Sequence, residues 1–245
     1  MAASLPLLTL DRGNSTLDCM LHGAGEPAPR RRLAPDDLAG LRQFLAVRPT
    51  AAVGVTVVTD GLAAATTMLQ AQGIPLQLAG THLPCPLPLD YATPQTLGAD
   101  RWLAALAAFS AHGRAITIDC GSATTINLVE ADGTFRGGAI APGLRALQAG
   151  LAAAAPALPA ADFEQLAWPP RSSIAAVSAG IAAAFCGTIE RAVADLLRVA
   201  RGPCTLVLTG GNAPFYLAHG RLQPRHVPDL IHQALRLLAE RACGS

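Results

Sequence analysis

The 245-residue chain is expected to fold as an α/β protein made of two related domains, residues 1–112 and 113–245. Two observations support this expectation. Short apolar runs that end in turn residues alternate with longer segments of helical periodicity, a pattern typical of strands that alternate with helices. In addition, Leu10–Leu17 recurs as Ile118–Thr125, 108 residues further on, whereas the repeats of a solenoid are only about 20–50 residues long.

Strands are expected wherever a short apolar or β-branched run stops at turn residues. They are Leu5–Leu10, Thr16–Leu21, Ala51–Val58, Ile74–Leu78, Ile116–Asp119, Thr124–Glu130, Thr134–Ile140 and Leu206–Thr209. The first two flank a tight turn and therefore form a hairpin, and Asp132-Gly133 is a second hairpin signal. The segment His22–Pro35 is rich in Gly, Pro and Arg and is expected to be a solvated loop, Arg30–Arg32 included.

Helices are expected where apolar residues recur at helical spacing between capping and stop signals. They are Pro35–Val47, Gly61–Gln72, Gly98–Ala111, Leu144–Ala155, Ser172–Ala200 and His226–Cys243. The first has Asp36 and Asp37 in its first turn, where acidic side chains suit the helix dipole. The Pro-rich segment Thr81–Pro94 is expected to be irregular.

Composition narrows the classes of protein to which the chain can belong. Hydrophobic residues make up 51% and charged residues 14%, which excludes a disordered polyelectrolyte. The formal net charge of +1 provides no strong field for nucleic acid or for a membrane surface, so neither is expected as a partner. All 18 basic residues are arginine, which excludes a Schiff-base lysine and a P-loop lysine; codon bias in a GC-rich genome explains this usage.

The cysteines and the apolar segments indicate a soluble, cytoplasmic protein. The six cysteines lie far apart without C-x-x-C spacing, so free thiols in a reducing compartment are expected. No basic region precedes the apolar run in Met1–Leu10, which is unlike a signal peptide. The most apolar stretch, Ala139–Ala161, contains Arg145 and three prolines and does not form a membrane span.

The internal repeat carries a chemical pattern. Each copy has an apolar strand, then Asp-x-Gly and small hydroxyl or amide residues, then a second strand, in residues 10–17 and 118–125. Glycine allows a tight turn that brings backbone N–H groups close to an anion, and an aspartate holds a hard cation directly or through water. For a single copy an ordinary hairpin turn is the better interpretation. Two matching copies favour the binding of a nucleotide triphosphate and its metal.

Five motifs, in order along nearly the whole chain, resemble those of the type III pantothenate kinases of the acetate/sugar kinase–Hsp70–actin superfamily. The matching segments are Asp11–Ser15 (D-x-G-N-T in the family), Tyr91–Arg101 (Y-x-x-P-x-x-L-G-x-D-R), Asp119–Thr125 (D-x-G-T-A-x-T), Gly137–Gly143 (G-G-x-I-x-P-G) and Thr209–Ala213 (T-G-G-x-A). Tyr91–Arg101 meets every fixed position and is specific to the family, whereas the D-x-G motifs occur across the superfamily.

The resemblance implies a fold and a reaction. The fold is two ribonuclease-H-like domains, as in actin-like ATPases, with an interdomain nucleotide cleft. The reaction is ATP-dependent phosphorylation of pantothenate, the first step toward coenzyme A. ATP, Mg²⁺ and a monovalent cation, K⁺ or NH₄⁺, are the implied cofactors. A homodimer is the implied assembly; the Ala-rich face of Ser172–Ala200 suits close helix packing, although such faces also pack inside monomers.

The same resemblance assigns residues to roles. Asp100 is the proton acceptor, and a carboxylate at a helix start is chemically suited to that role. Residues matched to substrate binding are Tyr91, Gly98, Ala99, Asp100, Arg101 and Ser173. Residues matched to ATP binding are Asp11, Gly13, Asn14, Ser15, Ser122, Gly210 and Gly211. Asp11 also lies near the Mg²⁺ of ATP, and Asp119 is matched to the monovalent cation. From sequence alone, Ser172 or Ser173 is better explained as a helix N-cap, and both roles can coexist.

The chain departs from the family pattern at four positions. Ser15, Ser122 and Ser173 replace threonine and keep the hydroxyl. Asp18 replaces a lysine that faces the phosphates, which removes attraction and adds repulsion. Three explanations are open: Asp18 points away, another group such as Arg12 supplies the charge, or ATP binds weakly. The alternative function is therefore a catalytically weakened member that acts as a regulatory or accessory protein.

Overall fold

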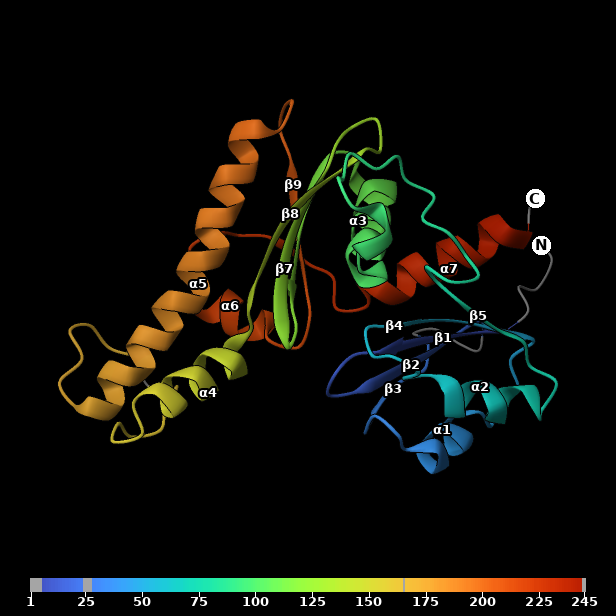
Figure 1. Ribbon diagram of the computed structural model, residues 1–245, viewed down its shortest axis with the longest axis horizontal. Coiled ribbons are helices and arrows are strands. Elements are labelled where there is room, and N and C mark those ends of the chain that lie inside the picture. Colours follow the sequence, from blue (N-terminus) through green and yellow to red (C-terminus); the bar gives the residue numbers. More distant parts are fainter. Residues whose placement is uncertain (1–5, 24–27, 165, 244–245) are drawn as a thin grey trace. The chain divides into compact units, whose positions relative to one another are not determined.

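The computed structural model describes residues 6–23, 28–164 and 166–243, which form two compact units (Figure 1). The first unit comprises Met1–Pro88, Ala92–Ser110 and Asp229–Ser245. The second comprises Leu89–Tyr91 and Ala111–Pro228. Each unit has its own five-stranded mixed sheet, so the predicted α/β class and its two related sheets are confirmed.

The sheet of the first unit has the order β3-β2-β1-β4-β5. Its strands are β1 (Leu7–Arg12), β2 (Leu17–His22), β3 (Arg30–Leu33), β4 (Ala51–Thr56) and β5 (Leu76–Leu78). The predicted hairpin is present, because β1 pairs antiparallel with β2; β1 also pairs in parallel with β4. Strand β1 therefore lies between β2 and β4. The turn that follows β1 lies at the carboxyl end of the parallel pair β1 and β4.

Helices cover both faces of this first sheet. They are α1 (Leu38–Phe44) and α2 (Ala63–Gln70) on one face and α7 (Leu230–Cys243) on the other. The unit also contains α3 (Ala99–His112), which follows the short 3₁₀ helix η1 (Pro94–Thr96). Leu8 and Leu10 point into an apolar core under α1 and α2. The residue between them, Thr9, points to the opposite face, as strand alternation requires, and there β1 and β4 pack against α7 (Figure 1).

The sheet of the second unit repeats this plan. Its strands are β6 (Ala115–Cys120), β7 (Ala123–Val129), β8 (Phe135–Pro142), β9 (Thr205–Thr209) and β10 (Arg225–His226), in the order β10-β9-β6-β7-β8. Its helices are α4 (Leu144–Ala154), α5 (Ser173–Val199) and α6 (Ala213–His219). Read from the other edge, the order is first hairpin, then parallel strands, as in the first unit. The sequence repeat is thus a repeat of topology.

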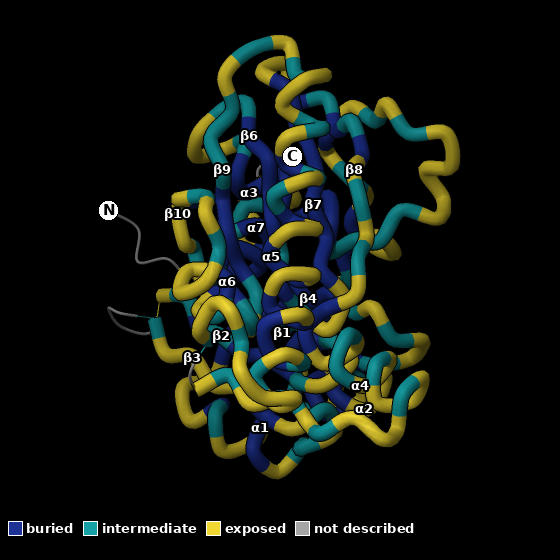
Figure 2. The backbone as a smooth tube through the Cα atoms, turned by 90° about the vertical axis from the view of Figure 1, so that its left-hand side faces the viewer, coloured by how far each residue is buried: buried dark blue, intermediate teal, exposed yellow. Residues whose placement is uncertain are grey.

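Apolar side chains of both units are buried on the central strands, which are dark blue in Figure 2. In the second unit, Ile116, Ile118 and Ile126 pack against Phe185 and Ile189 of α5. One side of α5 therefore belongs to the core, while its exposed positions are yellow in Figure 2. The five cysteines whose side chains are described are free thiols, as predicted.

Every predicted strand and helix is present, with ends displaced by a few residues, but four elements were missed, one of them the 3₁₀ helix η1. The expected loop His22–Pro35 contains an edge strand, β3, because Arg30–Leu33 pairs antiparallel with β2. The short helix α6 and the two-residue strand β10 were not predicted, and the last helix begins at Leu230 instead of His226. Leu5, the expected start of the first strand, lies outside the described residues.

The helix α5 is the one described helix whose length and composition would let it cross a membrane, with 39% of the relevant window buried. It packs against β6, β7 and β8 and against its neighbours α4 and α6. A core helix of a soluble protein has the same properties, so this helix is only weak support for a membrane span.

Candidate functional site

The turn after β1 carries the first Asp-x-Gly motif. Asp11 is the penultimate residue of β1, and the turn closes through a 3.0 Å hydrogen bond from the Gly13 N–H to the Thr16 carbonyl. Asn14 and Ser15 lie exposed at its tip. The predicted nucleotide residues of the first motif are therefore adjacent on an accessible turn at a strand end, where phosphate and metal sites are common.

Asp18 stands directly opposite Asp11 in the β1–β2 hairpin and is buried. Two arginines of β3 bind its carboxylate. Arg30 donates from Nε to Oδ1 at 2.9 Å and from Nη2 to Oδ2 at 2.7 Å. Arg32 donates from Nε and Nη2 to Oδ2 at 3.2 and 3.1 Å. Such charge-assisted pairs, one of them a two-point fork, are the strongest kind in proteins.

A histidine from the C-terminal helix completes this buried network. His232 Nε2 lies 3.3 Å from Asp18 Oδ1, and His232 Nδ1 lies 2.8 Å from the Thr9 hydroxyl. Burial alone raises the pKa of Asp18, but His232 and Arg30 outweigh it through hydrogen bonds and charge, so the pKa lies well below its usual value. The carboxylate is ionised and compensated.

The contacts of Asp18 bear on the three explanations for this residue. Its side chain does not point to solvent, and the compensating charge comes from Arg30 and Arg32. Arg12 has other contacts: Nη1 donates to the Gly13 carbonyl, and Nη2 lies 3.9 Å from Asp36. The expectation of a loop at Arg30–Arg32 was wrong, because this segment is strand β3 and its pairing aligns Arg32 with Asp18, but the three arginines are exposed, as expected.

In the second unit, two predicted motifs meet at the carboxyl ends of the parallel strands β6 and β9. Asp119 pairs in register with Thr209, the last residue before Gly210. Gly210 has a φ of +93°, and a Cβ added there would lie 2.5 Å from Asp119 Oδ1. A side chain at this position would clash with the carboxylate, so glycine is required both by conformation and by space.

Neighbouring hydrogen bonds hold these two loops together. Asn212 donates its backbone N–H to the Cys120 carbonyl at 2.8 Å and its Nδ2 to the Gly121 carbonyl at 3.0 Å. The Ser122 carbonyl accepts from the Gly143 N–H at 3.2 Å. A Cβ on Gly143 would lie 2.4 Å from that same carbonyl. The structure thus brings together Asp119, Ser122, Gly210 and Gly211, which lie far apart in sequence.

The predicted substrate residues Gly98–Arg101 form the start of α3. Asp100 lies in its first turn, and a Cβ on Gly98 would lie 2.5 Å from Asp100 Oδ1, so the carboxylate packs over a residue without a side chain. Burial raises the pKa of Asp100, while hydrogen bonds to the backbone at Arg101 and Asp100 and the charge of Arg101 lower it; burial dominates. Arg101 is itself buried.

Tyr91 and Ser173 belong to the second unit. The Tyr91 ring packs against Phe135 at a centroid distance of 6.1 Å, and it would lie 3.3 Å from a Cβ on Gly137. The N-cap of α5 is Ser172, whose Oγ accepts from the Ala175 N–H at 3.2 Å. Ser173 is therefore the first helical residue and is exposed, so capping does not explain its hydroxyl.

The described acidic, histidine and cysteine side chains limit how a metal ion could be held. Within the part of the chain that the structure describes, no three His, Cys, Asp or Glu side chains gather as a metal site. Mg²⁺ carried by ATP needs no such cage, because it is usually bound by one or two carboxylates together with phosphate oxygens. Asp11 fits that requirement.

Sequence reasoning missed four residues of the site region. Arg30 and Arg32 could have been found from the alternation of an Arg-x-Arg pair along a strand, had β3 been recognised. His232 had no local signal, because α7 meets β1 only in the folded chain. Asn212 lies within the motif Thr209–Ala213, but its two hydrogen bonds to the β6–β7 turn depend on the tertiary structure.

Solved structures with the same architecture cover nearly all of the chain. A proposed transcriptional activator of the Baf family from Campylobacter jejuni superposes with a TM-score of 0.61 at 18% identity, covering 97% of this chain and all of that one. MreB5 of Spiroplasma citri bound to ADP gives a TM-score of 0.51 at 11% identity, with 98% of each chain covered. At these identities the likeness concerns the fold alone, which is that of actin-like ATPases and sugar kinases.

Sequence relatives identify the family. The family model for type III pantothenate kinase matches residues 7–195. The type III pantothenate kinase of Saccharopolyspora erythraea is 30% identical over 98% of this chain and all of its own length, and that of Azoarcus sp. is 32% identical over 95% and 90%. The relative from Rhodopirellula baltica reaches 42% identity, and the chain spans about half of that relative's length (50%).

These matches confirm the resemblance and the kinase class that it implies: an ATP-binding transferase family of coenzyme A biosynthesis, made of soluble metabolic enzymes. They do not support a regulatory or accessory protein. The chain belongs to the type III pantothenate kinase family.

Proposed function

We propose that this chain transfers the γ-phosphoryl group of ATP to the hydroxyl of pantothenate, with Asp100 as the proton acceptor. The observation that carries the proposal is the family match over residues 7–195, which includes the intact segment Tyr91–Arg101. In the reaction, the hydroxyl oxygen attacks the γ-phosphorus, its proton passes to the Asp100 carboxylate, and ADP leaves. Burial supports this role, because a raised pKa makes the carboxylate a better base.

The nucleotide is proposed to bind through both acidic turns. Asp11 with Gly13, Asn14 and Ser15 would contact phosphate and Mg²⁺ in the first unit. In the second, Ser122, Gly210 and Gly211 would contact ATP. The support is that each group is adjacent within its own unit and lies at a strand end. That both turns bind the same nucleotide stays a prediction.

For pantothenate, we propose a guanidinium contact and an aromatic contact. Arg101 suits the substrate carboxylate because its planar fork matches two oxygens. Gly98 and Ala99 would contribute backbone contacts. Tyr91 would contribute the face of its ring, and Ser173 a hydroxyl that does not serve as the N-cap of α5. Asp119 is proposed to hold K⁺ or NH₄⁺; oxygen ligands suit such ions, and the absence of a side chain at Gly210 leaves space beside its Oδ1.

The experiment is a coupled assay of ADP formation. We expect turnover that requires both pantothenate and Mg²⁺ and that rises on adding K⁺. In Asp100→Asn, kcat should fall by about 10²–10⁴-fold with little change in the KM for ATP, because a positioned base contributes a factor of this order. The comparison variant is Ser173→Ala, in which kcat should fall less than in Asp100→Asn. Full activity of Asp100→Asn would exclude Asp100 as the base.

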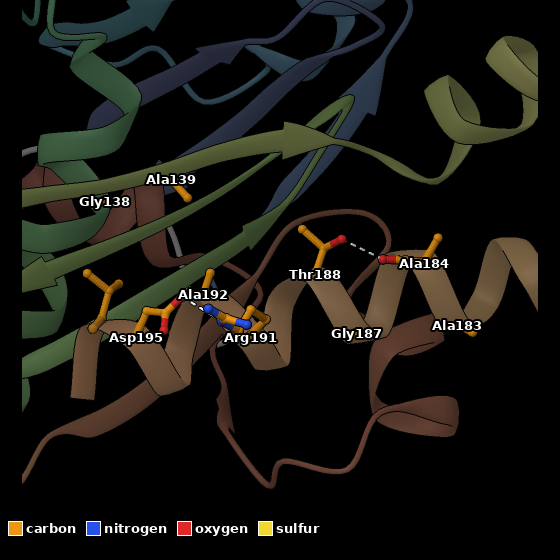
Figure 3. A pocket seen from close by; sticks show the side chains of 10 residues that line it. Gly138, Ala139, Ala183, Ala184, Gly187, Thr188, Arg191, Ala192 and Asp195 are labelled. Carbon is orange, nitrogen blue, oxygen red and sulfur yellow. Dashed lines mark hydrogen bonds and ion pairs between the residues drawn. The ribbon is translucent and has the colours of Figure 1, made fainter. Parts of the chain in front are cut away.

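A homodimer is proposed on the basis of a groove between β8 and α5, with a volume of about 700 Å³ (Figure 3). It is lined mostly by small residues, including Gly138, Ala139, Ala184 and Gly187, together with the ion pair of Arg191 and Asp195, and Ile140 next to it on β8 is 64% exposed. A second copy of the chain would cover this apolar surface. Light scattering should show that Ala184→Arg, in the groove, yields monomers, while Ala194→Arg, on α5 outside it, does not.

A cytoplasmic location is also proposed, in keeping with the free thiols.

A further inference from the structure

The three arginines of β3 lie on two different faces of the first sheet. Arg32 is the register partner of Asp18, and Arg30 is the partner of Met20, so both share the face on which Asp18 lies. Arg31 alternates with them and pairs with Cys19, a member of the opposite apolar core. Strand geometry thus separates Arg30 and Arg32, which bind Asp18, from Arg31.

This cluster has more positive charge than Asp18 requires. One carboxylate is contacted by two guanidinium groups, which leaves a formal surplus of one positive charge. The bonds to Asp18 use Nε and Nη2 of each arginine, so the Nη1 groups are not engaged in them. The side chain of Arg32 is 54% exposed and that of Arg30 28%, while that of Asp18 is only 7% exposed. The surplus charge is therefore on the solvent side.

The surplus lies beside the turn that follows β1. Asp11, Asp18 and Arg32 form one row across β1, β2 and β3, because Asp18 is in register with both of the others. The pKa of Arg30 is raised, first by its hydrogen bonds to Asp18 and then by the charges of Asp18, Asp229 and Asp11, against the effect of burial, so its guanidinium is within electrostatic reach of Asp11. The chain contains no lysine, so arginine alone provides permanent side-chain cations.

We propose that Arg30 and Arg32, oriented by Asp18, form the cationic contact to the phosphate chain of the nucleotide bound at the β1–β2 turn. This inference rests on the proposed function, because that assigns the nucleotide phosphates to residues 13–15. Arginine presents a rigid fork that matches phosphate oxygens. Asp18 acts as a positioning residue: it fixes two long side chains in place and lowers the entropy lost when phosphate binds.

The test is binding of ATP, ADP and adenosine to purified full chain, measured by calorimetry with Mg²⁺ and without turnover. The main variant is Arg32→Gln, which leaves Asp18 with both bonds from Arg30 and so keeps the buried charge paired. We expect the Kd for ATP and ADP to rise about tenfold, since a charged hydrogen bond contributes more than about 1.4 kcal/mol. The Kd for adenosine should not change, and the rise should shrink at high salt.

The matched control is Arg31→Gln, which removes the same charge from the same strand but on the other face. It should bind ATP with the wild-type Kd. The double variant Arg30→Gln/Arg32→Gln, combined with Asp18→Asn so that no charge is buried alone, should lose more affinity for ATP than Arg32→Gln. Wild-type ATP affinity in Arg32→Gln, an equal loss in Arg31→Gln, or a parallel loss of adenosine binding would overturn the proposal.

The pantothenate assay on the same samples separates this inference from the proposed function. A wild type that binds ATP in an Arg32-dependent manner but does not phosphorylate pantothenate would refute the function and leave the arginine contact standing. A wild type that phosphorylates pantothenate while Arg32→Gln binds ATP normally would refute the arginine contact alone.

Discussion

Asp18 keeps its negative charge in a buried position because two guanidinium groups and an imidazole surround it. Without these partners, burial of the charged carboxylate would be strongly unfavourable, because the carboxylate would lose its hydration. A change at this position therefore changes a network of four side chains, one of which comes from the far end of the chain. Substitutions of Asp18 are expected to affect stability as well as nucleotide binding.

The variant Asp18→Lys should destabilise the fold instead of improving it. It would place a third cation beside Arg30 and Arg32 and near His232, and breaking a buried pair typically costs about 3–5 kcal/mol. Urea unfolding should show a loss of this order, with a clearly smaller loss for Asp18→Asn, which introduces no repulsion. If Asp18→Lys were as stable as the wild type, the network would contribute nothing to folding.

Protonation of His22 should weaken the fold in acid. Burial, together with the charges of His232 and Arg236, lowers the pKa of His22 to about 4, while the charge of Asp229 acts in the opposite direction. The unfolded chain therefore binds this proton near pH 6.5 and the folded chain only near pH 4, so stability falls as pH drops through this window. Asp18, with its lowered pKa, stays ionised throughout.

The measurement for His22 is the urea midpoint at pH 7 and pH 5. In the wild type, the urea midpoint should be lower at pH 5 than at pH 7. In His22→Gln, whose side chain can still form a hydrogen bond with Thr9, this decrease should be smaller. An identical pH dependence in both proteins would show that another group causes it.

Gly138 in strand β8 and Gly180 in helix α5 have very different surroundings. Gly138 lies in β8, where an added Cβ would be 1.9 Å from the Ile126 carbonyl of β7. Gly180 lies in α5, exposed, with nothing within 4 Å of an added Cβ. The first is fixed by the close approach of two strands, and the second has only the entropic disadvantage of glycine in a helix.

Alanine should therefore have opposite effects at the two sites. Gly138→Ala should destabilise by about 3 kcal/mol or more, because strand backbones would have to separate. Gly180→Ala should stabilise by about 0.5–1 kcal/mol through helix propensity. Thermal unfolding of both variants checks this pair, and a neutral Gly138→Ala would mean that β7 and β8 do not pack as described.

The C-terminal helix α7 completes the first unit. α7 contacts β1 and β4 of the first unit, and its Leu230, Ala234, Leu235 and Leu238 are buried. The first unit is thus assembled from both ends of the chain. The two sheets share one strand order, but the helix that completes the first is encoded after the whole second sheet.

A chain that ends at Pro228 should therefore lose the first unit selectively. Without α7, an apolar face of β1 and β4 is exposed, and Thr9 and Asp18 lose His232. Trp102 of α3 is 3% exposed in the full chain and reports on the first unit. Its fluorescence should shift to the red in the shortened chain. Trp168 of the second unit is already 73% exposed, so it should change little. An unchanged spectrum would show that α7 is dispensable.

Most strands and helices, the repeat and the family motifs followed from the sequence, because hydrophobic periodicity and turn chemistry are set by neighbours a few residues apart. The edge strand β3 was missed since its three arginines lack an apolar alternation and only pairing with β2 makes it a strand. The compensation of Asp18 by Arg30, Arg32 and His232, and the place of α7, were decided by tertiary contacts alone. Such contacts depend on strand register and helix docking between distant segments, and no local pattern records them.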